Sequence, residues 1–517
     1  MPVEKIDLRS TQSFSDFFLD YLDDHEALRP FYGLRPEVRC FEEQIGKKQL
    51  SDEKRKVLTE VLQEQYQSLD KSTVVSTNIT ELANPQTYTI TTGHQLNIFT
   101  GPLYFIYKIA TVVNACKTLK AKYPNYHFVP VYWMASEDHD FDEISYFNLF
   151  GKKHEWKTEQ KGAVGRFKTD GLDEVLEAMP EQVQLFEEAY RKQGNLSDAA
   201  RYYVNALFGD EGVIVVDADH AKLKAQFVSV IKDDLLHSTA NDLVEATNKE
   251  LETEGYKPQI YSREINFFYL QEGSRERIVK SDDGYEINNT SLKFTETEIL
   301  AEVDRHPERF SPNVVMRPLY EEVILPNLAY VGGPAEMIYW MQLPKVFAHY
   351  ETTFPILLPR NFALYINNAT QKKLDKFGWT NEDLFKAGED LKSEYLAKYG
   401  EKAMSLNGEV EDLQKVYDLL AEKAATVDAS LKGFIAAEHA KAAKGLENIA
   451  KRLKKSEEQK HETALNQIQG IKDKLFPDGG LQERHDNFLN FYINNPDFVK
   501  EILASLDAFD LRMHIIR

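Results

Sequence analysis

The stretch YTITTGHQLNIFTGP, residues 88–102, joins a strand pattern to the beginning of a helix. Its first residues are aromatic or β-branched, which predicts a strand. Pro102 suits the first turn of a helix, where its missing N–H is harmless, and Leu103, Ile106 and Ile109 follow at helical spacing. The stretch therefore predicts a strand, a polar loop that contains glycines, and a helix.

Short apolar runs that alternate with helical patterns continue along the chain. This alternation predicts an α/β fold in which a mostly parallel sheet has helices on both faces. The core is expected to extend over residues 1–380. The expected strands are residues 88–91, 128–133, 213–216, 314–316, 328–331 and 355–358.

Other regions do not follow this alternation of strands and helices. Polar stretches near residues 151–195 and 241–305 are interpreted as insertions that decorate the core. Residues 381–475 are rich in Ala, Glu, Lys and Leu and contain no proline, and their three-four apolar spacing predicts a long helical hairpin or coiled coil. A compact helical domain is the alternative. Residues 476–517 are expected to return to the core, with a final strand at 513–516.

The composition argues against several classes of protein. With 83 acidic and 62 basic residues, the chain has a formal net charge of −21, which disfavours a nucleic-acid partner because such partners are bound largely through their phosphates. The two cysteines, Cys40 and Cys116, are too few for a disulfide framework and fit a reducing compartment. No signal peptide and no apolar run of membrane-spanning length is visible, so we expect a cytoplasmic protein without a membrane partner.

The loop after the first expected strand is a candidate anion site. Its backbone N–H groups would lie at the positive end of the following helix, where a phosphate is favoured. The pattern is neither a Gly-x-Gly-x-x-Gly nor a Walker sequence, and a plain structural turn is the alternative. The residues expected to contact a nucleotide here are Gly93, His94, Gln95, Thr100 and Gly101.

The loop after the second expected strand, Glu137–Asp138–His139–Asp140, concentrates carboxylates around a histidine. Histidine titrates near neutral pH and suits the removal of a proton from an amine, so Asp138 and His139 are the catalytic candidates. Glu137 and Asp140 are expected to contact the substrate, and carboxylates of this kind can hold Mg²⁺ together with ATP. A solvated acidic loop is the alternative.

A third loop, rich in glycine, follows the expected strand at 328–331. Gly332 and Gly333 allow a ligand to approach the backbone, and Glu336 would hold a ribose hydroxyl, while a plain turn is the alternative. Arg360 is a candidate for binding substrate or phosphate groups, although exposure to solvent is favoured for a cation at this place. Because ligand sites in such folds gather beyond the carboxyl ends of the strands, the three loops are expected to line one crevice.

Together these motifs resemble the family of bacillithiol biosynthesis enzymes that add cysteine. The resemblance spans most of the chain, and the order and spacing of the motifs make it specific. His94 departs from the pattern, since glutamine is common at that position among relatives, and this favours a pocket residue over an obligatory catalyst. The matching motifs are Thr92–Gln95 with Thr100–Pro102, Glu137–Asp140, Ser311–Asn313 with Arg317–Pro318, Val331–Pro334 with Glu336, Pro359–Arg360, and Leu481–Arg484.

The resemblance implies a Rossmann-like parallel-sheet core similar to that of class I aminoacyl-tRNA synthetases, with connecting insertions and a helical coiled-coil domain. It also implies a ligase that joins L-cysteine to the amine of glucosaminyl-malate, which forms bacillithiol. ATP is the expected co-substrate, and analogy with the synthetases favours a cysteinyl-adenylate over an acyl phosphate. No counterpart of the synthetases' Lys-Met-Ser-Lys-Ser loop stands out.

Two other functions are compatible with the same sequence. One is a different nucleotide-dependent ligase or nucleotidyltransferase, and the other is a coiled-coil scaffold whose core is inactive. The apolar seam expected along residues 381–475 would leave surface that a second copy can cover. A homodimer that uses this region is therefore expected, because closed two-fold dimers are the commonest assembly.

Overall fold

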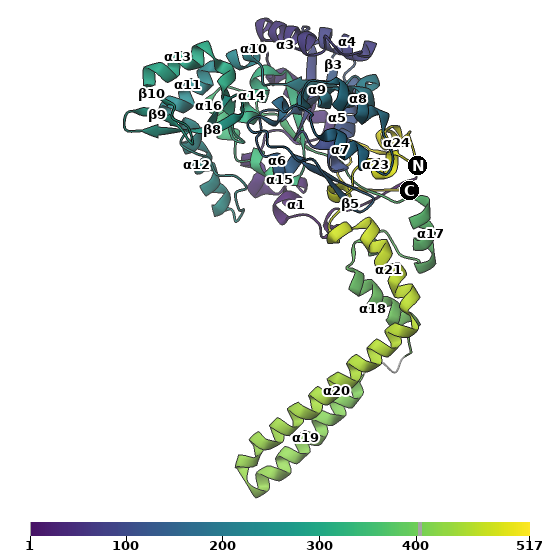
Figure 1. Cartoon of the computed structure of the whole chain (residues 1–517). Coiled ribbons are helices and arrows are strands. Elements are labelled where there is room, and N and C mark those ends of the chain that lie inside the picture. The colour runs from purple at the N-terminus through teal and green to yellow at the C-terminus, as the bar shows by residue number, and fades with distance from the viewer. Residues whose placement is uncertain (1, 402–405) are drawn as a thin grey trace. The chain divides into compact units, whose positions relative to one another are not determined.

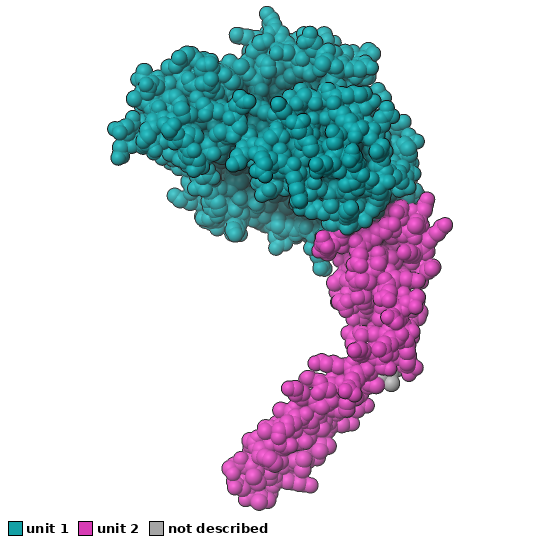
Figure 2. Space-filling model, in the orientation of Figure 1, with its two compact units in different colours: residues 1–365, 480–517 teal, residues 366–479 magenta. Residues whose placement is uncertain are grey.

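The computed structural model describes residues 2–401 and 406–517 and contains two compact units (Figures 1 and 2). Unit 1 comprises the chain up to Tyr365 together with Gly480–Arg517, and unit 2 comprises Ile366–Gly479. The boundaries expected from the sequence fall after residues 380 and 475. Residues 402–405, within the region expected to be helical, lie outside the described residues.

A sheet of five parallel strands forms the centre of unit 1, in the order β13-β12-β2-β3-β6. Counted along the chain, the strands start at the centre with β2, continue to one edge through β3 and β6, and then return to the other side of β2 through β12 and β13. This is the order of a Rossmann fold, with its change of direction between β2 and β12. The predicted α/β, Rossmann-like fold is confirmed. The strands are β2 (Thr87–His94), β3 (His127–Met134), β6 (Ile214–Asp217), β12 (Asn327–Gly332) and β13 (Ile356–Pro359).

The central strands are apolar runs because helices cover the sheet. All eight residues of β2 are buried, as expected for a parallel strand with covered faces. Helix α5 (Tyr104–Lys122) packs against β2 and β3, and its Val112 and Leu119 share a buried cluster with Ile90. The loop between β2 and α5 is therefore held at both ends by the core.

One expected strand is wrong. Residues 314–316 lead instead into the helix α14 (Met316–Ile324). The side-chain oxygen of Asn313 accepts hydrogen bonds from the backbone N–H groups of Val315 and Met316, which a helix start leaves without a partner. At this helix start Val315 and Met316 are buried, while Val314 is exposed.

The region around residues 241–305 builds a second sheet, which is antiparallel and has the order β10-β9-β8-β7-β11. It includes strand β11, which immediately precedes Asn313 and α14. Its elements are α12 (Thr239–Thr253), β7 (Phe267–Gln271), β8 (Ser274–Ser281), β9 (Gly284–Ile287), β10 (Lys293–Phe294), α13 (Glu296–Arg305) and β11 (Phe310–Pro312). The polar stretch near residues 151–195 contains a hairpin strand and helices: β5 (Lys152–Glu155, paired with β4, Tyr146–Leu149), α7 (Leu172–Glu177) and α8 (Gln184–Lys192).

A third sheet brings the two ends of the chain together. Strand β15 (Met513–Ile516) pairs antiparallel with β1 (Val3–Ile6) and parallel with β14 (Phe362–Tyr365). The tail thus rejoins unit 1 through a strand at the place where the sequence predicts one.

Unit 2 consists of helices. The two longest, α19 (Asn407–Val427) and α20 (Lys432–Lys460), lie side by side as an extended hairpin (Figure 1). No residue of 407–427 is buried, so the hairpin has no enclosed core of its own. A small buried cluster lies instead between α18 (Gly388–Tyr399) and α21 (Glu462–Leu475).

The remaining helices belong to unit 1, except for one in unit 2. In the described ranges, no helix is both long and apolar enough to cross a membrane. These helices are α1 (Asp16–Leu22), α2 (Phe41–Lys47), α3 (Asp52–Gln65), α4 (Thr73–Glu81), α6 (Phe141–Ile144), α9 (Leu196–Phe208), α10 (Ala221–Ala225), α11 (Val228–His237), α15 (Pro334–Trp340), α16 (Pro344–His349), α22 (Gln482–His485), α23 (Leu489–Tyr492) and α24 (Phe498–Ser505), with α17 (Asn368–Phe377) in unit 2.

Candidate active site

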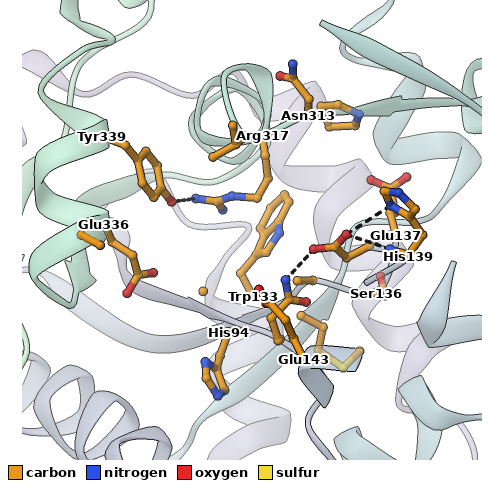
Figure 3. A pocket seen from close by; sticks show the side chains of 18 of the residues that line it. His94, Trp133, Ser136, Glu137, His139, Glu143, Asn313, Arg317, Glu336 and Tyr339 are labelled. Atoms are coloured by element: carbon orange, nitrogen blue, oxygen red, sulfur yellow. Dashed lines mark hydrogen bonds and ion pairs between the residues drawn. The ribbon is translucent and has the colours of Figure 1, made fainter. Parts of the chain in front are cut away.

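A pocket of about 860 Å³ lies at the carboxyl ends of β2, β3 and β12 (Figure 3). Its wall takes residues from the loops that follow all three strands. The carboxyl ends of parallel strands meet at one edge of a sheet, and the reversal of strand order between β2 and β12 opens a crevice there. The structure therefore brings the three loops singled out in the sequence to one place.

The pocket includes most, but not all, of the site residues expected from the sequence. Figure 3 shows Glu137 and His139 on one side of it and Glu336 and Tyr339 on the other. The expected residues that line it are Gly93, His94, Gln95, Glu137, Asp138, His139, Gly333, Glu336 and Arg360; those that do not are Thr100, Gly101, Asp140 and Gly332.

The later part of the β2–α5 loop is engaged in internal hydrogen bonds. The N–H of Phe99 donates to the Tyr190 hydroxyl at 2.7 Å, and the N–H of Leu103 donates to the carbonyl of Asp486 at 2.7 Å. Gly101 has a φ of +62°, and a Cβ at this position would come within 2.5 Å of the Asn97 side chain. These residues hold the connection between β2 and α5, and their amides do not form a phosphate cradle.

A buried lysine joins the first and third loops. Lys108 of α5 donates to the carbonyl of Gly93 at 2.7 Å and forms an ion pair with Glu336 at 2.6 Å. Glu336 also accepts hydrogen bonds from the Tyr330 hydroxyl at 2.6 Å and from the N–H of Gly333 at 2.8 Å. Burial raises the pKa of Glu336, but the charge of Lys108 and these hydrogen bonds outweigh it and hold the pKa below its ordinary value. Glu336 is therefore an ionised carboxylate at neutral pH.

Two arginines in the pocket wall have carboxylate partners of their own. Arg317 donates to Glu321 at 2.7 Å, and its guanidinium lies over the Tyr330 ring. Arg360 donates to Glu483 at 2.6 Å and is only 2 % exposed. The expectation that Arg360 lies in solvent is wrong, because its charge is paired with the carboxylate of Glu483, which is also buried.

His94 lies in the pocket as a neutral imidazole. Its ring is buried between Tyr104 and Phe105, and its Nε2 atom has no hydrogen-bond partner among the described residues. Burial, followed by the charges of Lys108 and Arg360, lowers the pKa of His94 well below its ordinary value. This nitrogen is therefore a buried polar atom whose hydrogen-bonding capacity no described residue uses.

Asp138 is held as a carboxylate by its neighbours. Gln95 donates to it at 2.5 Å, and the N–H of His139 donates at 2.7 Å. Burial raises the pKa of Asp138, but the charge of Arg275, the bond from Gln95 and the bond from the backbone N–H of His139 together bring it below its ordinary value. Such a group attracts a cation and is a weak proton acceptor near neutral pH.

His139 is oriented by Arg275, which strand β8 supplies from the inserted sheet. An Arg275 nitrogen lies 2.8 Å from Nδ1 of His139, while the nearest oxygen of Asp138 lies 3.5 Å from the same Nδ1. Since arginine can only donate, Nδ1 is the acceptor and the ring proton is on Nε2. His139 thus presents a donor in this arrangement.

Glu137 differs from its neighbour Asp138. Its carboxylate contacts the ammonium of Lys224, which is fully buried and also donates to the carbonyl of Phe310 at 2.8 Å. Burial raises the pKa of Glu137 to about 7, although the charge of Lys224 acts in the opposite direction. Glu137 is therefore the carboxyl group of this loop that titrates near neutral pH.

Sequence reasoning missed several charged residues of the pocket. Lys108 is a lysine on a largely buried helix, which is a signal that could have been used. Arg275 and Arg277 alternate on one strand, but only the register of the inserted sheet shows where they point. Arg484, whose guanidinium lies over the Tyr104 ring, belongs to the Leu481–Arg484 motif, for which the sequence indicated no function. Within residues 2–401 and 406–517, no group of three or more His, Cys, Asp or Glu is arranged to hold a metal ion.

Comparison with known proteins gives one family for the whole chain. Residues 1–361 match the family described as "Bacillithiol biosynthesis BshC, N-terminal Rossmann-like domain", and residues 363–517 match "Bacillithiol biosynthesis BshC, C-terminal coiled-coil domain". A protein of Cytophaga hutchinsonii is 43% identical over 99% of this chain and 98% of its own length. Proteins of Flavobacterium psychrophilum and Flavobacterium johnsoniae are 42% and 41% identical over the full length of both chains. All three carry the name "Putative cysteine ligase BshC".

The pair between Lys108 and Glu336 can be tested by its effect on stability. Lys108→Met leaves the Glu336 carboxylate and the Gly93 carbonyl without their buried cation, so the free energy of unfolding should fall by about 3–5 kcal/mol. Lys117→Met is the matched control, because Lys117 is on the same helix and forms an exposed pair with Glu211. Its effect should be about 1 kcal/mol or less. Urea unfolding followed by circular dichroism measures both, and equal losses would contradict the assignment.

Proposed function

The chain belongs to the bacillithiol biosynthesis BshC family, and we propose that it is a cysteine ligase that joins L-cysteine to the amine of glucosaminyl-malate. The name of its relatives supports the ligase activity. The observation that carries the proposal is the single pocket, which combines unpartnered ligand-binding atoms at the β2–β12 crevice with the acidic loop of Glu137–His139. We place the reaction in the cytoplasm, in keeping with two cysteines that are both free.

Formation of this amide meets two obstacles at neutral pH. The carboxylate of cysteine is a poor electrophile, and the acceptor ammonium is not a nucleophile. We propose ATP as the co-substrate that activates the carboxylate, with an adenylate preferred over an acyl phosphate by analogy with class I aminoacyl-tRNA synthetases. Formation of the adenylate releases pyrophosphate. The acceptor ammonium then gives one proton to the protein, and the free amine attacks the cysteine carbonyl carbon. The bond to AMP breaks as the amide forms, and the second N–H proton passes to water.

The β2–β12 side of the pocket fits a nucleotide. Nε2 of His94 and Oε1 of Gln95 are buried and have no hydrogen-bond partner in the part of the chain that the structure describes. A Cβ at Gly333 would meet no atom closer than 3.5 Å, so this glycine leaves room for a ligand beside the backbone. Arg484 supplies a cation, and Glu336 retains capacity to accept a hydroxyl hydrogen bond. Mg²⁺ bound to phosphates needs only one or two protein carboxylates and keeps several waters, so it can enter with the nucleotide.

Different residues of the acidic loop have different roles in the reaction of the acceptor amine. Ionised Asp138 binds the ammonium form, since its charge persists at neutral pH. Glu137 accepts the proton, because its pKa of about 7 matches the working pH. The Nε2–H of His139 donates to an oxygen of the reacting carbonyl. This assignment moves the proton-accepting role from Asp138 or His139, as the sequence suggested, to Glu137.

The reaction itself is the first test. Purified protein with L-cysteine, glucosaminyl-malate and ATP should give the amide product by mass spectrometry. Asp138→Asn and His139→Ala should remain folded and bind nucleotide but lose about a hundredfold in turnover, because each removes one group that acts on the reacting atoms. Asp140→Asn is the control, since Asp140 is exposed and does not line the pocket, and it should retain turnover.

Two results would contradict this proposal. Full activity in both variants would show that the acidic loop does not handle the amine. Product formation without ATP or another activated donor would show that the carboxylate is not activated in the proposed way.

The dependence of rate on pH tests Glu137. A base must be deprotonated to act, so kcat/KM should rise as the pH increases through about 7 and level off above it. This rise is the acidic limb of the pH–rate profile. Glu137→Gln should lose this limb and about a hundredfold in rate, because glutamine accepts no proton. Glu143→Gln, at another carboxyl group of the pocket, should keep the limb. A limb that persists in Glu137→Gln would assign the proton to another group.

We also propose that the chain forms a homodimer through the hairpin of unit 2. Large apolar side chains on α19 and α20 are exposed, among them Leu419 at 59% and Phe434 at 61%. Apolar seams of this kind are stabilised when a second helix pair covers them.

Charge placed in the seam tests the dimer. Leu419→Glu combined with Phe434→Glu should convert a dimer to a monomer in light scattering, because burying two carboxylates in an apolar interface is unfavourable. Leu419→Met with Phe434→Leu keeps the seam apolar and should remain dimeric. A wild-type chain that is monomeric at micromolar concentration would refute the proposal.

A further inference from the structure

The region between α12 and β9 supplies the pocket with two arginines that have no acidic partner among the described residues. Arg263 and Arg277 both line it, and both are exposed. Neither guanidinium has a hydrogen bond or ion pair with any residue in the described ranges. Arg275, Arg317 and Arg360 in the same wall each have a carboxylate within ion-pair distance. In a chain with a net charge of −21, two cations left without acids mark a place where an anion from outside is expected.

The register of the inserted sheet directs Arg277 toward the acidic loop. Arg275 and Arg277 are two residues apart on β8, so their side chains point to the same face of the sheet. Phe268 of β7 lies directly opposite Arg277, and its ring contacts both the Arg275 guanidinium at 4.0 Å and the His139 ring at 5.5 Å. Arg277 therefore follows Arg275 along the strand by roughly 7 Å, on the face that meets His139.

We propose that Arg263 and Arg277 form a dicarboxylate-binding subsite for the malate part of the acceptor, an inference that rests on the proposed function. A guanidinium binds a carboxylate through two parallel hydrogen bonds, and two arginines match the two carboxylates of a malyl group. A malyl group bound there extends the acceptor from the inserted sheet toward Glu137–His139, where its amine has to react.

Tyr261 adds an apolar surface to the same wall. It lines the pocket, it precedes Arg263 by two residues, and its side chain is 59% exposed. An aromatic ring with an apolar face and a polar tip suits a sugar ring, which has the same two properties. The wall thus presents features for both parts of a glycosidic dicarboxylate.

Nucleotide phosphates are the other anions of the reaction. Lys108, Arg317 and Arg484 lie at the β2–β12 side of the pocket, where the unpartnered nitrogen of His94 also lies. Arg277 comes instead from β8 of the inserted sheet, and Arg263 comes from the loop between α12 and β7. The geometry therefore favours the acceptor over the nucleotide, and kinetics with separate substrates distinguish them.

The test uses the full chain and two acceptors, glucosaminyl-malate and methyl glucosaminide, which has the same amine without carboxylates. Arg263→Gln and Arg277→Gln should each raise KM for glucosaminyl-malate by about tenfold or more, because each removes charged hydrogen bonds. KM for methyl glucosaminide, cysteine and ATP should change less than about twofold. Arg452→Gln, an exposed residue of α20, makes the same change of charge and should have no effect.

Other patterns would overturn the inference. An equal rise in KM for both acceptors would show that the arginines do not bind the carboxylates. A rise in the KM for ATP alone would show that they bind phosphates. If the wild-type chain forms no amide, the proposed function fails and a calorimetric titration with L-malate decides the subsite. Binding that is weakened in Arg263→Gln and Arg277→Gln but not in Arg452→Gln supports it, and a wild-type chain that binds no malate refutes it.

Discussion

The ion pair between Lys108 and Glu336 organises the pocket. It lies where the strand order reverses, and it ties the end of β2, through the Gly93 carbonyl, to the start of α15. A buried charge without its partner costs several kcal/mol, so neither residue can be ionised there without the other. The pair therefore holds the two glycine loops at one separation and leaves the space between them for a ligand. The same rule explains Arg360 with Glu483, which brings the end of the chain to the pocket wall.

The inserted sheet is part of the site and does not merely decorate the core. Arg275 extends from β8 to His139 and Asp138, and the carbonyl of Phe310 in β11 accepts a hydrogen bond from Lys224. Both contacts act on the acidic loop that follows β3. The charge of Arg275 from the insertion thus helps to lower the pKa of Asp138, and the Phe310 carbonyl holds the lysine that contacts Glu137. A chain with the same central sheet but without this insertion would have the strand-end crevice without the charge of Arg275 beside its acidic loop.

The sequence allowed much of the fold to be predicted and less of the site. Buried parallel strands are apolar on both faces, so five runs such as 88–91 and 328–331 could be recognised locally. The run at 314–316 failed because three apolar residues have no periodicity that separates a strand from a helix start. The shared crevice could be predicted because each of the three loops follows an expected strand and ligands bind beyond the carboxyl ends of such strands. Arg360 was misjudged because Glu483 is 123 residues away, and Arg275 was missed because its direction depends on a strand register that composition does not reveal.

The adjacent carboxyl groups of Glu137 and Asp138 show how one loop can present two chemistries. Both are largely removed from water, which alone would raise both pKa values. Asp138 has hydrogen-bond donors from Gln95 and His139 and the charge of Arg275, and its pKa falls. Glu137 has a single buried ammonium close to it, which does not outweigh the effect of burial, so its pKa is raised to about 7. Environments that separate the pKa values of neighbouring groups are the usual origin of distinct acid and base roles. A site that must first attract an ammonium and then remove its proton needs one group of each kind, and this loop places them next to each other in the sequence.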